Sequence, residues 1–348
     1  MGIKGLPQFL KQYFSDLFVP ISEADILRSR IAIDTGVFMH RFTVNMHYPD
    51  EYIARFLQFA QMLRNLSADF IFIFDGKPCS AKGNALKSRR DKRARNLLFL
   101  QQKIKALETE EQQVFRVLVQ QSTSTEKDGD SRTIAKLLAN LQHLRSKRML
   151  LLSRTIPINR GFFYRLQSIF ARDNIPYLEA DGEAEKACAW LADTGIVDLV
   201  VTEDYDALVC GAPRVLRYWH HHDRYCIPSV ISLAPVLERL RLTYQQFVTV
   251  CVLAGSDFAQ SPPYFGFRKA LAFVTSNTSN TTVRDIFDAN YRHYYGSSDV
   301  ADDARKAFEQ AHLIFANTKF PFLRNLLGIV VATGIAAILR VAISLNKI

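Results

Sequence analysis

The amino-acid sequence predicts an α/β protein with a mostly parallel central sheet flanked by helices. Short runs rich in Ile, Val and Phe occupy 29–38, 68–78 and 197–206, and an aspartate follows the apolar part of each run. Segments with the apolar spacing of amphipathic helices separate the runs, as in "YIARFLQFAQMLRNL" at 52–66. Buried strands that alternate with amphipathic helices are typical of α/β folds, in which the strands are mostly parallel.

The first two predicted strands each lead to an aspartate. "SRIAIDTGVF" reaches Asp34, and "ADFIFIFDGKP" reaches Asp75. Taken singly, Asp34 is an ordinary turn former, and Asp75–Gly76 is a common turn dipeptide. Ligands of open parallel sheets bind beyond the carboxyl ends of the strands, so acids at both ends indicate a shared site.

Three further segments supply acids. "ADGEAEKACAWLAD" places Glu183 and Glu185 at a helix start, where on their own they would favour the positive end of the helix dipole. "VDLVVTEDYD" delivers Asp204 and Asp206 at the end of a buried strand. "CVLAGSDF" adds Asp257 after another apolar run.

Together these segments predict a metal site at one edge of the sheet. Like charges at close range oppose ionisation unless a cation lies between them. Mg²⁺ prefers oxygen ligands, and two such ions about 4 Å apart can clamp the attacking water and the leaving oxygen of a phosphodiester. We therefore expect two Mg²⁺ ions, which Mn²⁺ can replace. The candidate metal residues are Asp34, Asp75, Glu183, Glu185, Asp204, Asp206 and Asp257.

Composition limits the alternatives. The formal net charge of +10 suggests a polyanionic partner. The five cysteines are scattered without a C-x-x-C pair, which favours reduced thiols over disulfides or a zinc site. Three adjacent histidines in "WHHHDRY" (219–225) cannot all face one ion in regular structure, so a metal role there is disfavoured.

Several motifs resemble the flap endonuclease/XPG family of the PIN-like superfamily. "MGIKGL", "AIDTGVF", "FIFDGKP", "IPYLEADGEAEKACAWL", "VVTEDYDALVCGAP" and "VCVLAGSDF" occur in the family's order, and "AFEQAHLIFANTKF" (307–320) is similar to the helix that closes its core. The resemblance covers roughly 1–320 and suggests a divergent member, one that could be viral. It implies a metal-dependent 5′ nuclease with a helical arch and a helix-hairpin-helix-type region, cutting near single-strand/double-strand junctions.

The resemblance also implies roles for single residues. Direct metal ligands would be Asp75, Glu185, Asp204 and Asp206. Ligands acting through coordinated water would be Asp34, Glu183 and Asp257.

The basic stretch "KGNALKSRRDKRAR" (82–95) has two interpretations. It is either a solvated helix face or, beside a metal site, a grip on the scissile phosphate. By the resemblance, Lys82 and Arg89 would hold the reacting phosphate. The other nucleic-acid contacts that we expect are Gly2, His40, Arg90, Lys92, Arg93, Gly266, Arg268 and Lys269. Among these, Gly2 would thread under the junction after methionine removal, and His40 occupies a position where relatives often carry a stacking tyrosine.

Two departures from the family pattern affect how substrate is held. The segment between Asp75 and Glu183 is longer than usual, so the arch at 96–160 is expected to be enlarged, and threading of a free 5′ end stays open. The hairpin region "GSDFAQSPPYFGFRKA" (255–270) keeps only Gly266 of the family's closely spaced glycines and adds prolines that have no N–H to offer a phosphate. Whether this hairpin binds duplex DNA, and whether it holds a monovalent cation, also stays open.

We predict a nuclease domain at 1–322, divided into an N-terminal part (1–95), the arch (96–160) and an internal part with the divergent hairpin (161–280). The tail 323–348 is apolar, and as a helix 325–346 would span about 33 Å, enough for a bilayer core. It is either a membrane anchor with the nuclease domain cytosolic or a helix packed on the core or on a partner. Without an anchor we expect a nuclear or cytoplasmic protein. No sliding-clamp-binding peptide is evident, and we expect a monomer.

The function predicted from these features is a Mg²⁺-dependent, structure-selective DNA endonuclease with 5′-exonuclease activity. One alternative is an RNA endonuclease of the same family that degrades messenger RNA, because the acids read phosphate and shape instead of the sugar. Another is a catalytically silent nucleic-acid-binding scaffold. The seven acids disfavour a scaffold, because a mere binder gains nothing from buried like charges.

Overall fold

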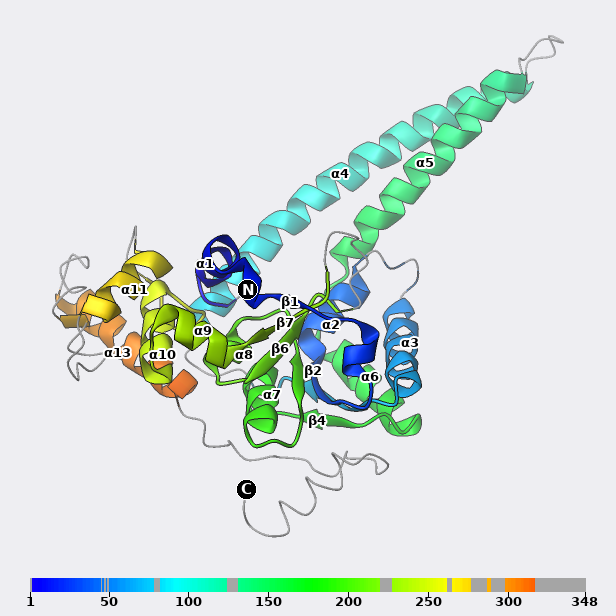
Figure 1. Cartoon of the computed structure of the whole chain (residues 1–348). Coiled ribbons are helices and arrows are strands. Elements are labelled where there is room, and N and C mark those ends of the chain that lie inside the picture. Colours follow the sequence, from blue (N-terminus) through cyan, green and yellow to red (C-terminus); the bar gives the residue numbers. More distant parts are fainter. Residues whose placement is uncertain are drawn as a thin grey trace. The chain divides into compact units, whose positions relative to one another are not determined.

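The computed structural model describes residues 2–44, 46, 48, 50–77, 82–123, 131–219, 227–261, 265–276, 287–288 and 298–316. The chain forms two compact units. The first comprises Met1–Phe38, Phe59–Ala85 and Phe163–Ile348, and the second comprises Met39–Gln58 and Leu86–Phe162. The first unit contains a sheet, and the second contains most of two long helices (Figure 1).

The sheet has seven strands in the order β1-β7-β6-β5-β2-β3-β4. The strands are β1 (Val19–Pro20), β2 (Arg30–Asp34), β3 (Asp69–Phe74), β4 (Tyr177–Glu179), β5 (Leu199–Val201), β6 (Arg214–Arg217) and β7 (Ser229–Ser232). The five strands from β6 to β4 are parallel, whereas β7 runs antiparallel to β6 and β1 antiparallel to β7. The predicted mostly parallel α/β fold is confirmed.

The central strands are buried on both faces, as the apolar runs predicted. Ala32 and Ile73 belong to one core cluster with residues of the helices α7 (Ala184–Asp193) and α10 (Tyr244–Ala254). The opposite face is aromatic: the Phe72 ring lies 6.0 Å from that of Phe59 and 4.9 Å from that of Phe170. A strand enclosed on both sides can expose polar groups only at its ends, which is where the acids lie.

Helices and short turns complete the described part of the chain. They are α1 (Leu6–Tyr13), η1 (Ser15–Leu17), η2 (Glu23–Ile26), α2 (Thr35–Thr43), α3 (Glu51–Asn65), α4 (Gly83–Thr123), α5 (Ser131–Thr155), α6 (Arg160–Arg172), α7 (Ala184–Asp193), α8 (Asp206–Val209), α9 (Leu233–Leu240), α10 (Tyr244–Ala254), α11 (Phe267–Ser276) and α13 (Ser298–Ala316). A capping box between Thr243 and Gln246 starts α10, whose later residues are all buried. The core therefore anchors the end of α10, from which the loop with Asp257 begins.

The long helices α4 and α5 lie side by side in the second unit (Figure 1). Leu100, Ile104 and Leu107 on α4 are buried, with the spacing that places side chains on one helix face. On α5, Arg145 and Arg148 donate from Nε to the two carboxylate oxygens of Glu111 at 2.8 and 3.0 Å. The predicted arch segment is thus helical, while its function and the domain boundaries stay predictions.

Two expectations concern the C-terminal region. The predicted closing helix at 307–320 starts earlier in the structure, because α13 spans Ser298–Ala316. The tail at 323–348 lies outside the described residues. Within the described ranges, no helix combines the length and apolar character needed to cross a bilayer.

Candidate active site

The carboxyl ends of two adjacent parallel strands place the first acids of the site. Asp34 ends β2, and Asp75 follows β3. Asp34 is 2 % exposed and accepts hydrogen bonds from the Thr202 hydroxyl at 2.7 Å and from the Gly36 N–H at 3.0 Å. These donors hold the Asp34 carboxylate in place behind the other acids.

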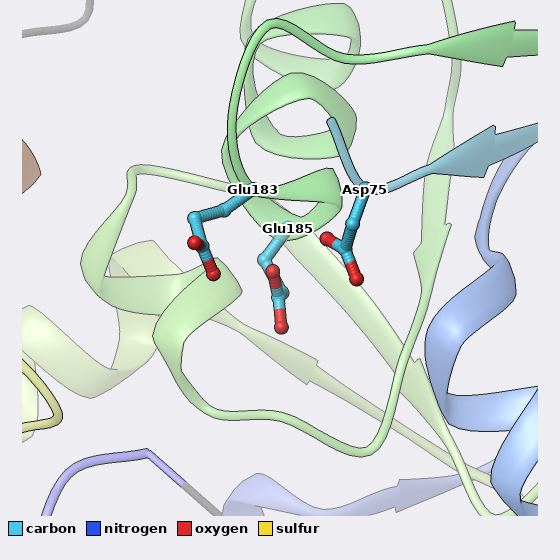
Figure 2. A group of neighbouring side chains, drawn as sticks. All are labelled: Asp75, Glu183 and Glu185. Atoms are coloured by element: carbon cyan, nitrogen blue, oxygen red, sulfur yellow. The ribbon is translucent and has the colours of Figure 1, made fainter. Parts of the chain in front are cut away.

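The start of α7 brings two glutamates to Asp75. The Ala184 N–H donates to Asp75 Oδ1 at 2.8 Å, so Asp75 caps the helix from another segment. Glu183 is the residue before the helix, and Glu185 lies in its first turn. One oxygen from each of Asp75, Glu183 and Glu185 lies within 4.8 Å of the others, and Figure 2 shows the three carboxylates directed toward a common space.

The turn after β5 supplies Asp204 and Asp206, both 6 % exposed. The Asp204 N–H donates to the Thr202 hydroxyl at 3.1 Å, and the Asp206 N–H donates to Asp204 Oδ1 at 3.1 Å. Burial is the largest cause that raises the pKa of Asp204 and that of Asp206, and the charge of Asp257, in the loop after α10, adds to it. The structure thus places Asp75, Glu183 and Glu185 in one group. Charge interactions connect this group with Asp34, Asp204, Asp206 and Asp257.

Burial and mutual repulsion raise the pKa values of the clustered acids. Burial, followed by the charge of Asp75, raises the pKa of Asp34 to about 7. Burial is also the largest cause for Glu185, whose pKa is raised well above its usual value, with Asp34 and Asp75 next. Asp206 behaves in the same way, with burial first and Asp204 second. Without a cation, part of the cluster must hold protons at neutral pH.

The donor set fits a divalent cation. Within the described part of the chain, Glu185 Oε2 and Asp206 Oδ1 are buried oxygens with no hydrogen-bond partner. Such atoms are costly unless something binds them. Carboxylate oxygens are the ligands that Mg²⁺ and Mn²⁺ prefer, so the residues present suit these ions.

Lys82 is the cation that the protein itself supplies. Its buried ammonium pairs with the Glu183 carboxylate and lies 4.9 Å from the ring centre of Phe258. Burial alone lowers the pKa of Lys82, but the ion pair with Glu183 and the charges of Glu185 and Asp206 outweigh burial, so that the pKa is raised. Lys82 is therefore charged and partly neutralises the acids.

Gly2 lies directly against the acid pair of the β5 turn. Its φ is +86°, and a Cβ built there would collide with Oδ1 of both Asp204 and Asp206. Only glycine fits this backbone and this approach. The sequence had suggested a role for Gly2 at the nucleic-acid junction, and the structure places it beside the acids.

Several of the predicted nucleic-acid contacts belong to the second unit. Arg89, Arg90, Lys92 and Arg93 are exposed on the part of α4 that belongs to the second unit. In that unit, His40 keeps contact with solvent, yet partial burial, then Arg93 and Arg89, lower its pKa. We expect His40 to be neutral at pH 7.

The predicted hairpin contacts lie at the start of α11. Gly266 precedes the helix, is exposed, and accepts hydrogen bonds from the Lys269 and Ala270 N–H groups at 3.1 Å. Arg268 is exposed and lies 5.2 Å from the ring centre of Tyr13. The prolines of this hairpin and the histidines at 220–222 lie outside the described residues.

Sequence reasoning missed the hydroxyl that joins two strand ends. Thr202 Oγ1 donates to Asp34 and accepts from the Asp204 N–H, so one side chain orients acids from two strands. Its position directly before the acids was the available signal. The thiols follow the prediction where they are described, because Cys188, Cys210 and Cys251 are free.

A cluster of carboxylates beyond the carboxyl ends of parallel strands suits an enzyme that uses divalent metal ions. The XPG N-terminal domain matches residues 1–96, and the XPG I-region matches 174–257, together just over half of the chain. The chain belongs to the flap endonuclease/XPG family of nucleases.

Individual relatives agree with this assignment. Flap endonuclease 1 of Cryptosporidium muris is 27% identical over 312 residues, which cover 83% of this chain and 58% of that protein. The catalytic core of Rad2 in complex with DNA substrate has a similar fold, with a TM-score of 0.58 at 14% identity, over 99% of this chain and 95% of that one. The Holliday junction-resolving enzyme GEN1 in complex with product DNA and Mg²⁺ ion also has a similar fold. Its TM-score is 0.53 at 16% identity, and the match covers 97% of this chain and 68% of that one.

The raised pKa values predict how the metal-free protein responds to pH. The folded pKa of Asp34 is about 7, against an ordinary value of 3.8, so between these values the folded protein binds more protons than the unfolded chain. Stability must then fall as the pH rises through this window. In EDTA, scanning fluorimetry should show a melting temperature that falls by roughly 5 °C from about pH 4 to about pH 7.

Excess Mg²⁺ should remove most of this slope, because the bound ion replaces the protons. The matched variant is Asp34→Asn, which lacks the titrating group and should show a flatter profile in EDTA. A wild-type melting temperature that does not fall with pH in EDTA would contradict the raised pKa.

Proposed function

We propose that the chain is a Mg²⁺-dependent, structure-selective endonuclease and 5′-exonuclease that hydrolyses DNA phosphodiester bonds at flap-type junctions by a two-metal mechanism. The observation that carries the proposal is the cluster of Asp75, Glu183 and Glu185, in which one oxygen of each lies within 4.8 Å of the others. Among the described residues, Glu185 Oε2 and Asp206 Oδ1 are also buried oxygens without a hydrogen-bond partner. DNA is favoured because the matched relative is a flap endonuclease and because Rad2 and GEN1 were solved in complex with DNA.

The acids divide into two groups in this proposal. Asp75, Glu185, Asp204 and Asp206 hold the ions directly, while Asp34, Glu183 and Asp257 act through water. When bound by these acids, two divalent ions would supply Lewis acidity for activating the attacking water and for neutralising charge on the leaving oxygen. The hydrogen bonds from Ala184 and Thr202 orient the acids before any ion arrives.

The basic residues complete the proposed chemistry. Lys82 and Arg89 hold the non-bridging oxygens of the reacting phosphate and stabilise the charge that develops there. Lys82 is paired with the Glu183 carboxylate, and its ammonium group, with three N–H donors, can contact the phosphate as well. Nucleic acid beyond the reacting phosphate is held by the exposed basic residues Arg90, Lys92, Arg93, Arg268 and Lys269, together with His40, Gly2 and Gly266.

The wider context is proposed from the sequence. We propose that the nuclease domain at 1–322 acts as a monomer, with α4 and α5 as its enlarged arch. The protein acts in the nucleus or cytoplasm, or at a membrane if the tail at 323–348 is an anchor. Carbonate extraction of membranes from cells that express the chain with and without 324–348 distinguishes these locations.

The test of the function is direct cleavage. Purified protein is incubated with labelled 5′-flap DNA, nicked duplex DNA and single-stranded RNA, in Mg²⁺, Mn²⁺ or EDTA. We expect cleavage of the flap near its junction in either metal and none in EDTA. Faster cleavage of RNA than of any DNA would favour the messenger-degrading alternative, and metal-independent binding without cleavage would favour a scaffold.

Removal of one proposed metal ligand should separate catalysis from binding. We expect Asp206→Asn to lower the single-turnover rate by roughly 100-fold or more, because the ion that it holds stabilises the transition state by several kcal/mol. Affinity for flap DNA in Ca²⁺ should stay within about threefold, since removal of negative charge does not disfavour a polyanion.

The matched control is Asp303→Asn on α13, where the side chain is 82% exposed. It should leave the rate and the affinity unchanged. Substantial Mg²⁺-dependent turnover in Asp206→Asn protein would overturn the metal assignment.

Arg89 is expected to act on the rate more than on binding. If it contacts the reacting phosphate, Arg89→Ala should lower the single-turnover rate at saturating protein by roughly 10²-fold, with a smaller change in affinity. Arg95→Ala is the control, because Arg95 is exposed on the same helix. Equal, small effects of both variants would support the solvated-face interpretation.

A further inference from the structure

Glu203 is the one acid of the "TEDYD" segment that does not join the metal cluster. Its carboxylate Oε1 accepts the Tyr218 N–H at 2.8 Å, and its Oε2 lies 3.5 Å from Arg217 Nη2. Its backbone carbonyl accepts a hydrogen bond from the same Arg217 Nη2 at 2.7 Å. The residue directly before Asp204 is therefore fastened to the end of β6 by both its side chain and its backbone.

Arg217 also contacts the residue on the other side of Asp204. Its guanidinium carbon lies 3.9 Å from the ring centre of Tyr205, which is 2% exposed and stands between Asp204 and Asp206. One buried side chain thus touches both neighbours of Asp204. Guanidinium groups stack on aromatic rings while donating in their own plane, a combination that a lysine ammonium cannot supply.

The hydrogen bonds inside the Glu203–Asp206 turn determine its shape, whereas its position on the sheet depends on contacts with neighbouring elements. The Asp204 and Asp206 N–H groups are satisfied by Thr202 and Asp204, which shape the turn itself. Strand β6 is the parallel neighbour of β5, with Leu216 opposite Val201. Arg217, the next residue after Leu216, therefore fixes the turn to the strand beside it.

Burial of the Arg217 guanidinium costs folding free energy, which argues that Arg217 has a role beyond packing. The Arg217 side chain is 6% exposed, and within the described residues its Nε has no hydrogen-bond partner. A buried cation with unsatisfied donors is often less stabilising than an apolar residue of similar size. The N-terminal segment reaches the same place, because Lys11 Nζ donates to Tyr218 Oη at 2.9 Å.

We propose that Arg217, paired with Glu203 and stacked on Tyr205, is a positioning residue that holds Asp204 and Asp206 in the arrangement needed to bind divalent metal. The inference rests on the proposed function, because it assigns these two aspartates to the metal. Arg217 touches neither the metal nor the reacting phosphate in this scheme. Its effect passes through the backbone of the Glu203–Asp206 turn.

The test measures metal binding without nucleic acid. Mn²⁺ is titrated calorimetrically into wild type, Arg217→Lys and the control Arg214→Lys, which changes an exposed arginine on the same strand. We expect Arg217→Lys to weaken Mn²⁺ binding about tenfold, as loss of an outer-shell partner typically does. Arg214→Lys should bind Mn²⁺ as wild type does.

A second readout separates positioning from general stability. The melting temperature of Arg217→Lys in EDTA should stay close to that of wild type, and its maximal cleavage rate should recover at high Mg²⁺ concentration. Wild-type Mn²⁺ affinity in Arg217→Lys would overturn the proposal, whatever its melting temperature.

Further variants keep the test decisive if Arg217→Lys does not fold. Tyr205→Leu removes the ring on which Arg217 stacks and should weaken Mn²⁺ binding several-fold, whereas Tyr205→Phe keeps the ring and should not. Equal affinities of these two variants would overturn the proposal. Wild-type protein that binds Mn²⁺ but cleaves no DNA would sink the proposed function alone, and wild-type protein that binds no Mn²⁺ would sink both.

Discussion

Repulsion between carboxylates at one edge of the sheet is the constraint on which the rest of the site depends. Asp34, Asp204 and Asp206 are almost fully buried, and burial raises their pKa values more than the charge of any single neighbouring acid does. An apoprotein must hold such groups together by other means. Lys82 supplies positive charge through Glu183, while hydroxyl and backbone N–H donors supply local dipoles. These contacts organise the site without a metal, and a divalent cation bound there would displace protons and reduce the repulsion together.

The fold meets this constraint by using rigid elements. Strands β2 and β3 are closed in by aliphatic side chains on one face and by aromatic rings on the other. This packing on both faces restrains the strands from which Asp34 and Asp75 follow. The Ala184 N–H at the start of α7 donates to Asp75, which follows β3. This hydrogen bond joins the two elements at the acid cluster. Precision of this kind is harder to obtain from loops.

The sequence predicted the sheet, its parallel character and the acids at the ends of its strands, because each depends on a local pattern. A buried strand shows as an apolar run, and an acid at its end is visible beside it. Hydrogen-bond and ion-pair partners from distant segments have no such local pattern in the sequence. Lys82 and Glu183 are 101 positions apart, and Thr202 and Asp34 are 168 apart, so these pairings needed the three-dimensional structure. Glu203 and Asp204 are adjacent acids in the sequence, and only their surroundings show that one turns to β6 and the other to the cluster.

The close approach of Gly2 to the aspartates has a practical consequence for work with this protein. Any residue added ahead of Gly2, including an affinity tag or the remnant that a protease leaves behind, starts its path beside Asp204 and Asp206. A histidine tag in that place brings imidazoles to a cluster suited to divalent cations, and it would compete with the carboxylates for the ions under study. Recombinant protein without a tag at this end avoids this interference, and a comparison of tagged and untagged preparations would show how far the N-terminal segment controls entry to the site.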